Sequence, residues 1–210
     1  MSEVKPVHAS VGRVPPAPNG KVASSLRTAL TQRVVVADGA MGTMIQARNP
    51  SMEDFQQLEG CNEILNITRP DLIADIHREY FRAGSDAVET NTFGANLANL
   101  AEYGIESRIY ELAKAGAQIA KDVAKEFSAD KERWVIGSLG PGTKLPTLGH
   151  TTYEILKNAY REAARGLIDG GADALLVETT QDLLQAKAAD RKSTRLNSSH
   201  TDISRMPSSA

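Results

Sequence analysis

Residues 83–90 read Ala-Gly-Ser-Asp-Ala-Val-Glu-Thr, and residues 170–179 read Gly-Gly-Ala-Asp-Ala-Leu-Leu-Val-Glu-Thr. In both stretches a glycine ends a helical pattern, and a short apolar run then leads to a glutamate and a threonine. Repeats of this kind are typical of parallel βα units, in which the polar residues at the ends of successive strands meet on one face. The chain is therefore predicted to be an α/β protein.

Four strands, separated by helices, are predicted around this repeat. The expected strands are Arg33–Ala37, Asp86–Thr92, Trp134–Leu139 and Ala174–Val177, and the expected helices begin at Met41, at Thr68 (to about Arg82), at Ile109 (to Phe127) and at the capping box Thr151–Glu154. Thr68 is the predicted N-cap of its helix because an acidic residue follows three positions later and a proline lies in the first turn. A complete (βα)8 TIM barrel has eight strands in about 250 residues, so we expect only its first four βα units here.

The composition excludes several classes of protein. The chain has 210 residues, of which 41% are hydrophobic and 24% charged, and its net charge is -2. It has no large basic patch before residue 190 and no apolar run of about 18 residues, so neither a nucleic acid nor a membrane is expected as a partner. The only cysteine, Cys61, cannot form an internal disulfide or, alone, a structural zinc site. We expect a cytoplasmic protein.

The sequence divides into three predicted parts. Residues 1–23 contain four scattered prolines and no apolar core of a signal peptide, which indicates a flexible N-terminal extension. Residues 24–189 carry the strand and helix pattern. Residues 190–210 are rich in serine and basic residues and show no structural period, and their sequence matches the translation of a common sequencing-library adapter. We therefore predict that residues 190–210 are an adapter-derived artefact.

Polar residues end the predicted strands. Asp38 and Glu178 directly follow predicted strands, and Glu89 and Asn91 lie toward the carboxyl end of another. Together with Thr179 they are expected to converge on one face of the barrel. Burying a carboxylate without a partner is costly, which favours a ligand-binding role. The alternative, that each carboxylate caps a helix or pairs with an arginine, stays open at this point.

Five motifs then carry a resemblance to a known family. They are residues 36–46 (Val-Ala-Asp-Gly-Ala-Met-Gly-Thr-Met-Ile-Gln), 61–63 (Cys-Asn-Glu), 89–93 (Glu-Thr-Asn-Thr-Phe), 140–144 (Gly-Pro-Gly-Thr-Lys) and 177–182 (Val-Glu-Thr-Thr-Gln-Asp). In order and spacing they resemble the N-terminal homocysteine-binding barrel of the cobalamin-dependent methionine synthase family, over nearly all of residues 26–189. The resemblance implies a (βα)8 barrel that binds homocysteine and activates its thiol on zinc for attack on methylcobalamin. Folate- and cobalamin-binding modules would lie downstream.

The same resemblance implies a homocysteine site. Asp38 and Glu178 would hold the ammonium group, and the backbone N–H groups from Gly39 to Thr43 would suit the carboxylate. Thr43 would add a hydroxyl contact, and Asn91 would lie at the rim.

The sequence departs from the family at the metal. The family's zinc is held by three cysteines on later strands, and none of them is present. Cys61, His77 and His150 are not spaced as zinc ligands, so no metal ligand and no catalytic residue is predicted. Neither zinc nor cobalamin is expected to bind this chain, which is predicted to be inactive alone. Two alternatives remain: a fragment of a cobalamin-independent methyltransferase that uses betaine or S-methylmethionine, and a non-catalytic half-barrel that binds a ligand or partner.

Overall fold

The structure is a computed structural model that describes residues 25–129 and 131–196, with the backbone alone over residues 191–196. The elements in chain order are α1 (Ser25–Gln32), α2 (Met41–Ala47), η1 (Asn62–Ile64), α3 (Leu65–Thr68), α4 (Pro70–Ala83), β1 (Ala87–Glu89), α5 (Leu97–Glu102), η2 (Glu106–Arg108), α6 (Ile109–Glu126), β2 (Trp134–Leu139), η3 (Pro146–Leu148), α7 (Tyr153–Asp169), β3 (Ala174–Val177) and α8 (Leu183–Leu196). The predicted N-terminal extension, residues 1–23, lies outside the described residues.

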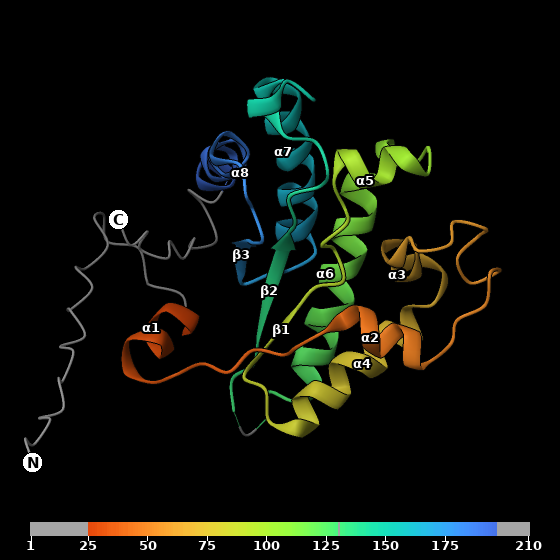
Figure 1. Cartoon of the computed structure of the whole chain (residues 1–210). Helices are drawn as coiled ribbons and strands as arrows, with labels where there is room; N and C mark the ends of the chain where they lie inside the picture. Colours follow the sequence, from red (N-terminus) through yellow and green to blue (C-terminus); the bar gives the residue numbers. More distant parts are fainter. Residues whose placement is uncertain (1–24, 130, 197–210) are drawn as a thin grey trace, which may run out of the picture.

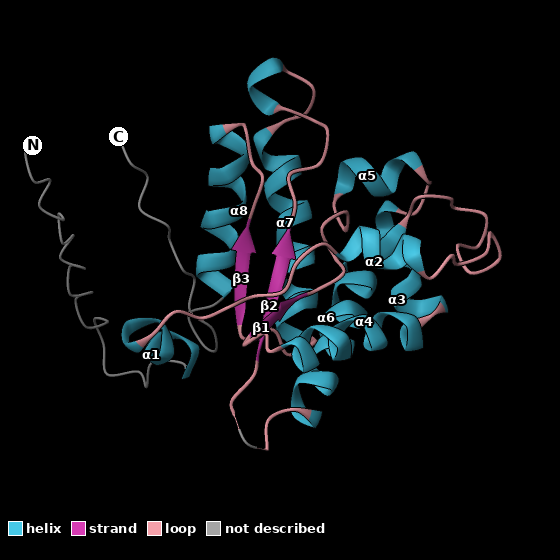
Figure 2. Ribbon diagram, turned by 60° about the horizontal axis from the view of Figure 1, so that its bottom comes forward, coloured by secondary structure: helices cyan, strands magenta, loops and turns pink. Residues whose placement is uncertain are grey.

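The described strands form one parallel sheet in the order β1-β2-β3 (Figures 1 and 2). Ala87 of β1 pairs with Trp134 of β2, and Ile136 of β2 pairs with Ala174 of β3. Helices α6 and α7 pack against β2, and α8 packs against β3. The predicted α/β class with parallel βα units is confirmed, although the described part of the chain has three strands rather than four.

The predicted strand Arg33–Ala37 forms no regular ladder in the structure: Arg33 lies in a bend after α1, and residues 34–37 have no regular secondary structure. Its Val36 carbonyl accepts hydrogen bonds from the amides of Asp86 (2.7 Å) and Ala87 (3.2 Å), and the Val36 amide donates to Asp86 Oδ2 (2.9 Å). This segment therefore runs beside β1 where a first strand would lie, and only the regular pairing was predicted wrongly.

The internal repeat explains this arrangement. Asp173, the counterpart of Asp86, donates its amide to the Val135 carbonyl (2.8 Å) and accepts from the Val135 amide through Oδ2 (2.8 Å). Asp86 makes the same two contacts with Val36. Both aspartates thus fasten the start of one strand to its neighbour, which places Val36 in the same position relative to β1 as Val135 of β2 has relative to β3.

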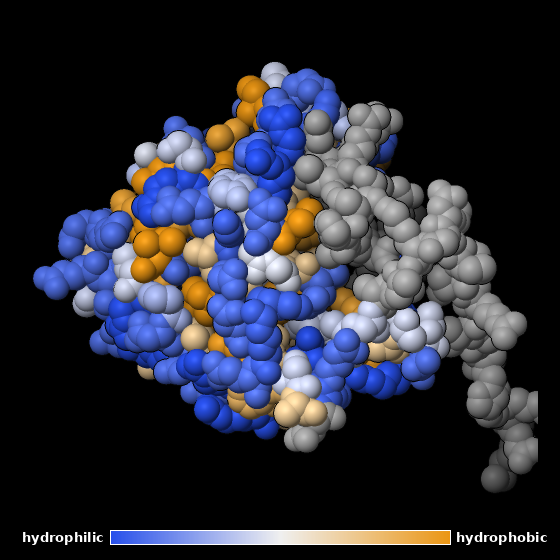
Figure 3. All heavy atoms as spheres, turned by 180° about the vertical axis from the view of Figure 1, so that it is seen from behind, coloured by the Kyte–Doolittle hydropathy of each residue, from blue (hydrophilic) through white to orange (hydrophobic). Residues whose placement is uncertain are grey.

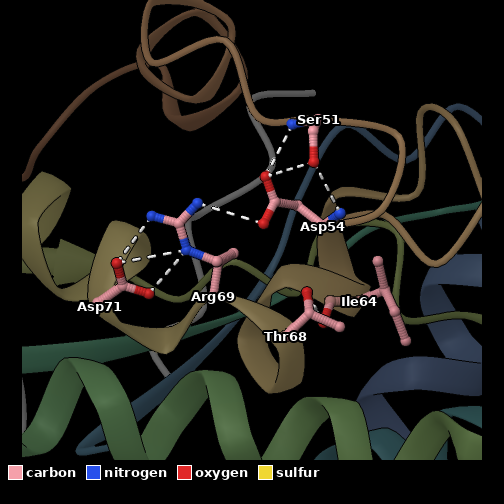
Figure 4. Close-up of polar contacts among 6 residues, drawn as sticks. All are labelled: Ser51, Asp54, Ile64, Thr68, Arg69 and Asp71. Carbon is pink, nitrogen blue, oxygen red and sulfur yellow. Dashed lines mark hydrogen bonds and ion pairs between the residues drawn. The ribbon is translucent and has the colours of Figure 1, made fainter.

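The predicted N-cap at Thr68 was wrong by one residue (Figure 4). Helix α4 begins at Pro70 with Arg69 as its N-cap, and the Thr68 hydroxyl donates back to the Ile64 carbonyl (3.2 Å) within α3. Arg69 instead binds the carboxylates of Asp71 (2.8 Å) and Asp54 (3.3 Å). An ion pair therefore takes the place of the expected capping box at this junction.

The second predicted strand, Asp86–Thr92, is shorter in the structure, where β1 spans Ala87–Glu89, and the other boundaries agree closely with the sequence. Strands β2 and β3 coincide with the predicted ranges, α6 ends one residue early at Glu126, and α7 is capped by Thr152, whose hydroxyl accepts from the Ile155 amide (3.3 Å). Helix α8 continues through the predicted boundary at residue 189 to Leu196. The proposed origin of the tail stays a prediction, since residues 197–210 lie outside the described part.

The core lies between the sheet and its helices. Helices α6 and α7 approach closely because Gly166 and Gly170 face the backbone of α6: a Cβ at either glycine would lie 2.5 Å from a carbonyl oxygen, of Tyr110 or Lys114. At the other end of the sheet, Leu26 of α1 packs with Ala87, Trp134 and Ala174, the first residues of the three strands. Helix α1 thus closes the amino end of the sheet and leaves the carboxyl end for other residues.

The outer face of the molecule carries the polar sides of these helices. Viewed from behind, its surface is mainly hydrophilic with scattered apolar patches (Figure 3). Within the described ranges, none of the helices is long and apolar enough to cross a membrane.

Candidate functional site

A cavity of about 490 Å³ lies at the carboxyl end of the sheet. It is bounded by the turn before α2, by η1, by the segment after β1, by β2 and by the residue after β3. The lining residues are Asp38, Gly39, Ala40, Met41, Gly42, Asn62, Glu63, Glu89, Thr90, Asn91, Thr92, Phe93, Ser138 and Glu178. A second cavity, near Tyr160, measures only about 10 Å³, which is too small for a metabolite.

Four of the five predicted site residues line the larger cavity. Asp38, Gly39, Asn91 and Glu178 meet there although they are far apart in the sequence. Thr43 does not: its side chain is exposed outside the lining, and its hydroxyl is 3.4 Å from the Ala40 carbonyl of its own turn. The convergence predicted from the strand ends is therefore present, and the contact of the Thr43 hydroxyl with homocysteine stays a prediction.

Asn91 forms part of the wall of the cavity, where its side-chain amide is fully hydrogen-bonded through Nδ2. Its Nδ2 donates to the Asn62 carbonyl (2.8 Å) and to Asn66 Oδ1 (3.0 Å), and Asn66 Nδ2 donates to the Asn91 carbonyl (2.8 Å). These buried amides tie the segment after β1 to η1 and α3. Asn91 thus shapes the cavity rather than reaching into it with its amide nitrogen.

Four carboxylates, from four separate segments, line the cavity: Asp38, Glu63, Glu89 and Glu178. Among the described residues that line it, there is no lysine, arginine or histidine. Burial is the main reason that the pKa of Asp38 rises from 3.8 to about 7, and the nearby Glu89 and Glu178 raise it further against the Glu89 amide, which donates to Asp38 Oδ1 (2.9 Å). The site therefore has an excess of negative charge that a cation would neutralise.

Two of the other carboxylates, Glu89 and Glu63, have raised pKa values as well. Burial, followed by repulsion from Glu178, raises the pKa of Glu89, and burial raises the pKa of Glu63. Glu178 is held differently, because the Ser138 hydroxyl donates to its Oε1 in a short contact. Glu178 is followed by Thr179, whose φ of 56° lies in the left-handed region that β-branched residues rarely adopt. Such local strain clusters at functional sites.

A short relay of hydroxyl groups connects the strands beneath the cavity. The Thr92 hydroxyl donates to the Ser138 carbonyl (2.8 Å), and Thr90 Oγ1 accepts from the Ser138 amide (3.0 Å). Because the Thr92 proton is committed to that carbonyl, Thr90 is the donor in the 2.6 Å contact between the two threonine hydroxyls. The relay holds β1 and β2 in register where both strands end.

The segment between β2 and α7 is fastened to the start of α8. The Thr147 amide donates to Asp182 Oδ2 (3.0 Å), and Gln185 Nε2 donates to the Pro141 carbonyl in a short contact. Asp182 Oδ1 also accepts from the Leu184 amide (2.8 Å) in the first turn of α8. These hydrogen bonds fix the connection between β2 and α7 in place beside the cavity.

The donor set does not fit the zinc site of the resembled family. Cys61, the single cysteine of the chain, is 1% exposed, lies outside the cavity lining, and has its thiol pKa raised to about 11 by burial and by Glu63. In the described part of the chain, no three histidine, cysteine, aspartate or glutamate residues are grouped so that they could hold a metal ion. The cavity residues can bind a cationic ligand, and we assign no metal-dependent step to them.

Comparison with known sequences decides the family. The profile of the family described as homocysteine S-methyltransferase matches residues 35–206, which include every segment that lines the cavity. This chain belongs to the homocysteine S-methyltransferase family. The match extends past residue 189, so it does not mark the predicted boundary there.

Relatives in this family include two mycobacterial proteins. The homocysteine S-methyltransferase chain is 62% identical over 167 residues to a methionine synthase of Mycobacterium tuberculosis and 59% identical to one of Mycobacterium leprae. Both alignments cover 79% of this chain and 14% of the relative. The chain thus spans about a seventh of the length of these relatives.

Solved structures share the fold of this homocysteine S-methyltransferase chain. The homocysteine methyltransferase MmuM from Escherichia coli, in its metallated form, superposes with a TM-score of 0.69 at 24% identity, covering 85% of this chain and 64% of MmuM. Its oxidized form gives a TM-score of 0.67 at 23% identity, with 85% and 63% covered. At this identity the likeness concerns the fold alone.

Several cavity residues were not predicted from the sequence. Glu63, Thr90 and Ser138 line the cavity, and none was predicted as a site residue. Glu63 carried a signal, since it is an acidic residue next to the apolar pair Ile64 and Leu65, where burial needs a reason. Ser138 lies in an apolar strand and could not be told from an ordinary strand residue.

Proposed function

We propose that this chain is the homocysteine-binding part of a methionine synthase, which transfers a methyl group to homocysteine and forms methionine. The observation that carries the proposal is the cavity lined by four carboxylates and, among its described lining, no cationic side chain. An amino acid brings an ammonium group that satisfies such a site. The 62% identity to a methionine synthase favours this enzyme over a methyltransferase that uses betaine or S-methylmethionine.

In this proposal Asp38 and Glu178 hold the ammonium group of homocysteine. Both line the cavity, and Glu178 is fixed by the Ser138 hydroxyl. The bound cation lowers the pKa of Asp38 from its raised value, so Asp38 becomes fully ionised when the ligand is present. The turn from Gly39 to Gly42 lines the same cavity, and its backbone faces the carboxylate of the amino acid.

The chemistry of methyl transfer needs groups that these residues do not supply. In the full-length family, zinc would bind and deprotonate the homocysteine thiol, and cobalamin and folate would supply the methyl group. The described residues do not fit zinc, so we propose that the chain alone binds homocysteine and is inactive without further segments of a methionine synthase, which act as its partners. The cytoplasmic location predicted from the sequence is kept as part of this proposal.

The test is isothermal titration of the 210-residue chain with L-homocysteine and with 4-mercaptobutyric acid, which lacks the amino group. We expect binding of homocysteine only. Asp38→Asn and Glu178→Gln should each weaken that binding by at least about tenfold, since each removes a charge-assisted contact. Glu106→Gln, an exposed glutamate of η2 outside the cavity, is the matched control and should bind normally. Equal binding of the two ligands would contradict the proposed site.

A further inference from the structure

One carboxylate of the cavity has no part in the proposed ammonium site. Glu63 lies on η1 and is 8% exposed, so it is more deeply buried than most glutamates in proteins. It borders the cavity, and the described lining of that cavity offers no lysine, arginine or histidine as an ion-pair partner. A buried carboxyl group in such a place needs a structural explanation.

The contacts of Glu63 point to the segment after β1. Its Oε1 accepts a hydrogen bond from the Gly94 amide (2.7 Å), and the Cys61 thiol lies 4.0 Å from Oε2. Gly94 sits directly on the carboxyl group: a Cβ at this position would lie 2.6 Å from Oε1 and 2.8 Å from Cδ. The absence of a side chain at Gly94 is what allows this close approach.

The segment that Gly94 belongs to, residues 92–96, reaches across to the opposite wall of the cavity. The Thr92 hydroxyl donates to the Ser138 carbonyl (2.8 Å), and the Ser138 hydroxyl donates to Glu178. On the other side, the Asn96 amide donates to the Gly94 carbonyl (2.7 Å) just before α5 begins. Glu63 is thus joined to Glu178 through Gly94, Thr92 and Ser138.

From this connection we infer that Glu63 is a positioning residue: it fixes residues 92–96 through the Gly94 amide, sets the place of Thr92 and Glu178, and does not itself hold the ligand's ammonium group. The inference rests on the proposed function for its binding readout. It also makes a claim about the loop that holds with or without a ligand.

A neutral side chain of the same shape should serve equally well. Burial raises the pKa of Glu63, and burial followed by Glu63 raises the pKa of the Cys61 thiol, which lies 4.0 Å from Oε2. Since the Gly94 amide requires only an acceptor oxygen, glutamine can replace the carboxyl group at this position. A glutamate that contacts the ammonium directly would not tolerate that change.

The experiment compares Glu63→Gln and Glu63→Ala in the 210-residue chain by amide hydrogen exchange at Gly94 and by titration with L-homocysteine. Glu63→Gln should keep both the exchange rate and Kd within about twofold, whereas Glu63→Ala should raise the Gly94 exchange rate and Kd by about tenfold or more, the effect of one lost hydrogen bond. Thr92→Val, as a matched variant, should weaken homocysteine binding while the Gly94 amide stays protected.

Two results would overturn the inference. Loss of homocysteine binding in Glu63→Gln, as severe as in Glu63→Ala, would show that the charge itself contacts the ligand. An unchanged Gly94 exchange rate in Glu63→Ala would show that Glu63 does not fix the loop. If that variant fails to fold, Glu63→Met, which fills the space without an acceptor oxygen, takes its place, and an unchanged Gly94 exchange rate there has the same meaning. If the unmodified chain binds no homocysteine, the proposed function fails, and the exchange rates at Gly94 still decide the role of Glu63.

Discussion

Asp38→Asn should make the folded chain more stable while it weakens ligand binding. Burial raises the pKa of Asp38 from 3.8 to about 7, so the ionised carboxylate is disfavoured in the folded state. Asparagine has nearly the same shape, and its Oδ1 can keep the hydrogen bond from the Glu89 amide, now 2.9 Å long. The substitution therefore removes a buried charge without removing its best-placed contact.

The magnitude depends on pH in a defined direction. Below pH 3.8 Asp38 is protonated in both the folded and the unfolded state, so its raised pKa does not destabilise the folded chain. Above about pH 7 Asp38 is ionised in both states, and the full destabilisation of the folded chain is present. At roughly 1.4 kcal/mol for each pKa unit, the gain from Asp38→Asn is about 4 kcal/mol at pH 8 and about 2 kcal/mol at pH 5. The stabilisation should thus grow as the pH rises.

Urea denaturation followed by circular dichroism at pH 5 and pH 8 measures both values. Glu106→Gln, whose side chain is exposed, should show no such pH-dependent gain. If Asp38→Asn is no more stable than the unmodified chain at pH 8, or if its gain is the same at both pH values, Asp38 is not a destabilising buried charge. A gain that falls with rising pH would show that Asp38 is stabilised as a carboxylate in the free protein.

Three further predictions concern other parts of the chain. Burial lowers the pKa of His77, whose ring nitrogens have no hydrogen-bond partner, from 6.5 to about 4, so stability should fall by about 3 kcal/mol as the pH drops from 6.5 to 4. His77→Leu should lose this step in urea titrations, and an unchanged pH dependence would contradict it. Leu167→Ala, at a fully buried position of α7, should cost about 2–5 kcal/mol of unfolding free energy in the same assay, and a cost below about 1 kcal/mol would mean that the core repacks. Val34 and Val36 are 80% and 55% exposed, so their replacement by threonine should slow aggregation in light-scattering measurements with little change in stability. An unaltered aggregation rate would show that these two exposed valines do not cause the aggregation.

The sequence predicted those elements whose local signals agreed with their packing. Trp134–Leu139 and Ala174–Val177 are strands in both descriptions, because buried apolar runs bounded by turns have few alternatives. The cap at Thr68 failed because Arg69 forms ion pairs with Asp54 and Asp71, and Asp54 lies 15 residues away in the chain. Local capping rules cannot include such a partner.

The predicted first strand shows the same limit. Residues 33–37 have strong β propensity, yet a ladder also requires neighbours with matching register. In the structure this segment is attached to β1 mainly through Val36 and Asp86, and no regular pairing follows. Propensity thus indicated a segment that runs beside β1, and tertiary contacts decided that it forms isolated hydrogen bonds instead of a ladder.

The candidate site divides in a similar way. Polar residues at the ends of parallel strands must meet at one edge, so the order of strands and the positions of Asp38, Asn91 and Glu178 were enough to predict their convergence. The raised pKa of Asp38, the burial of Glu63 beneath Gly94 and the turning of Thr43 away from the cavity depend on distances between segments far apart in the chain. Sequence order determines which residues reach the same edge of a sheet, but burial and charge at that edge arise only when the segments pack against one another in three dimensions.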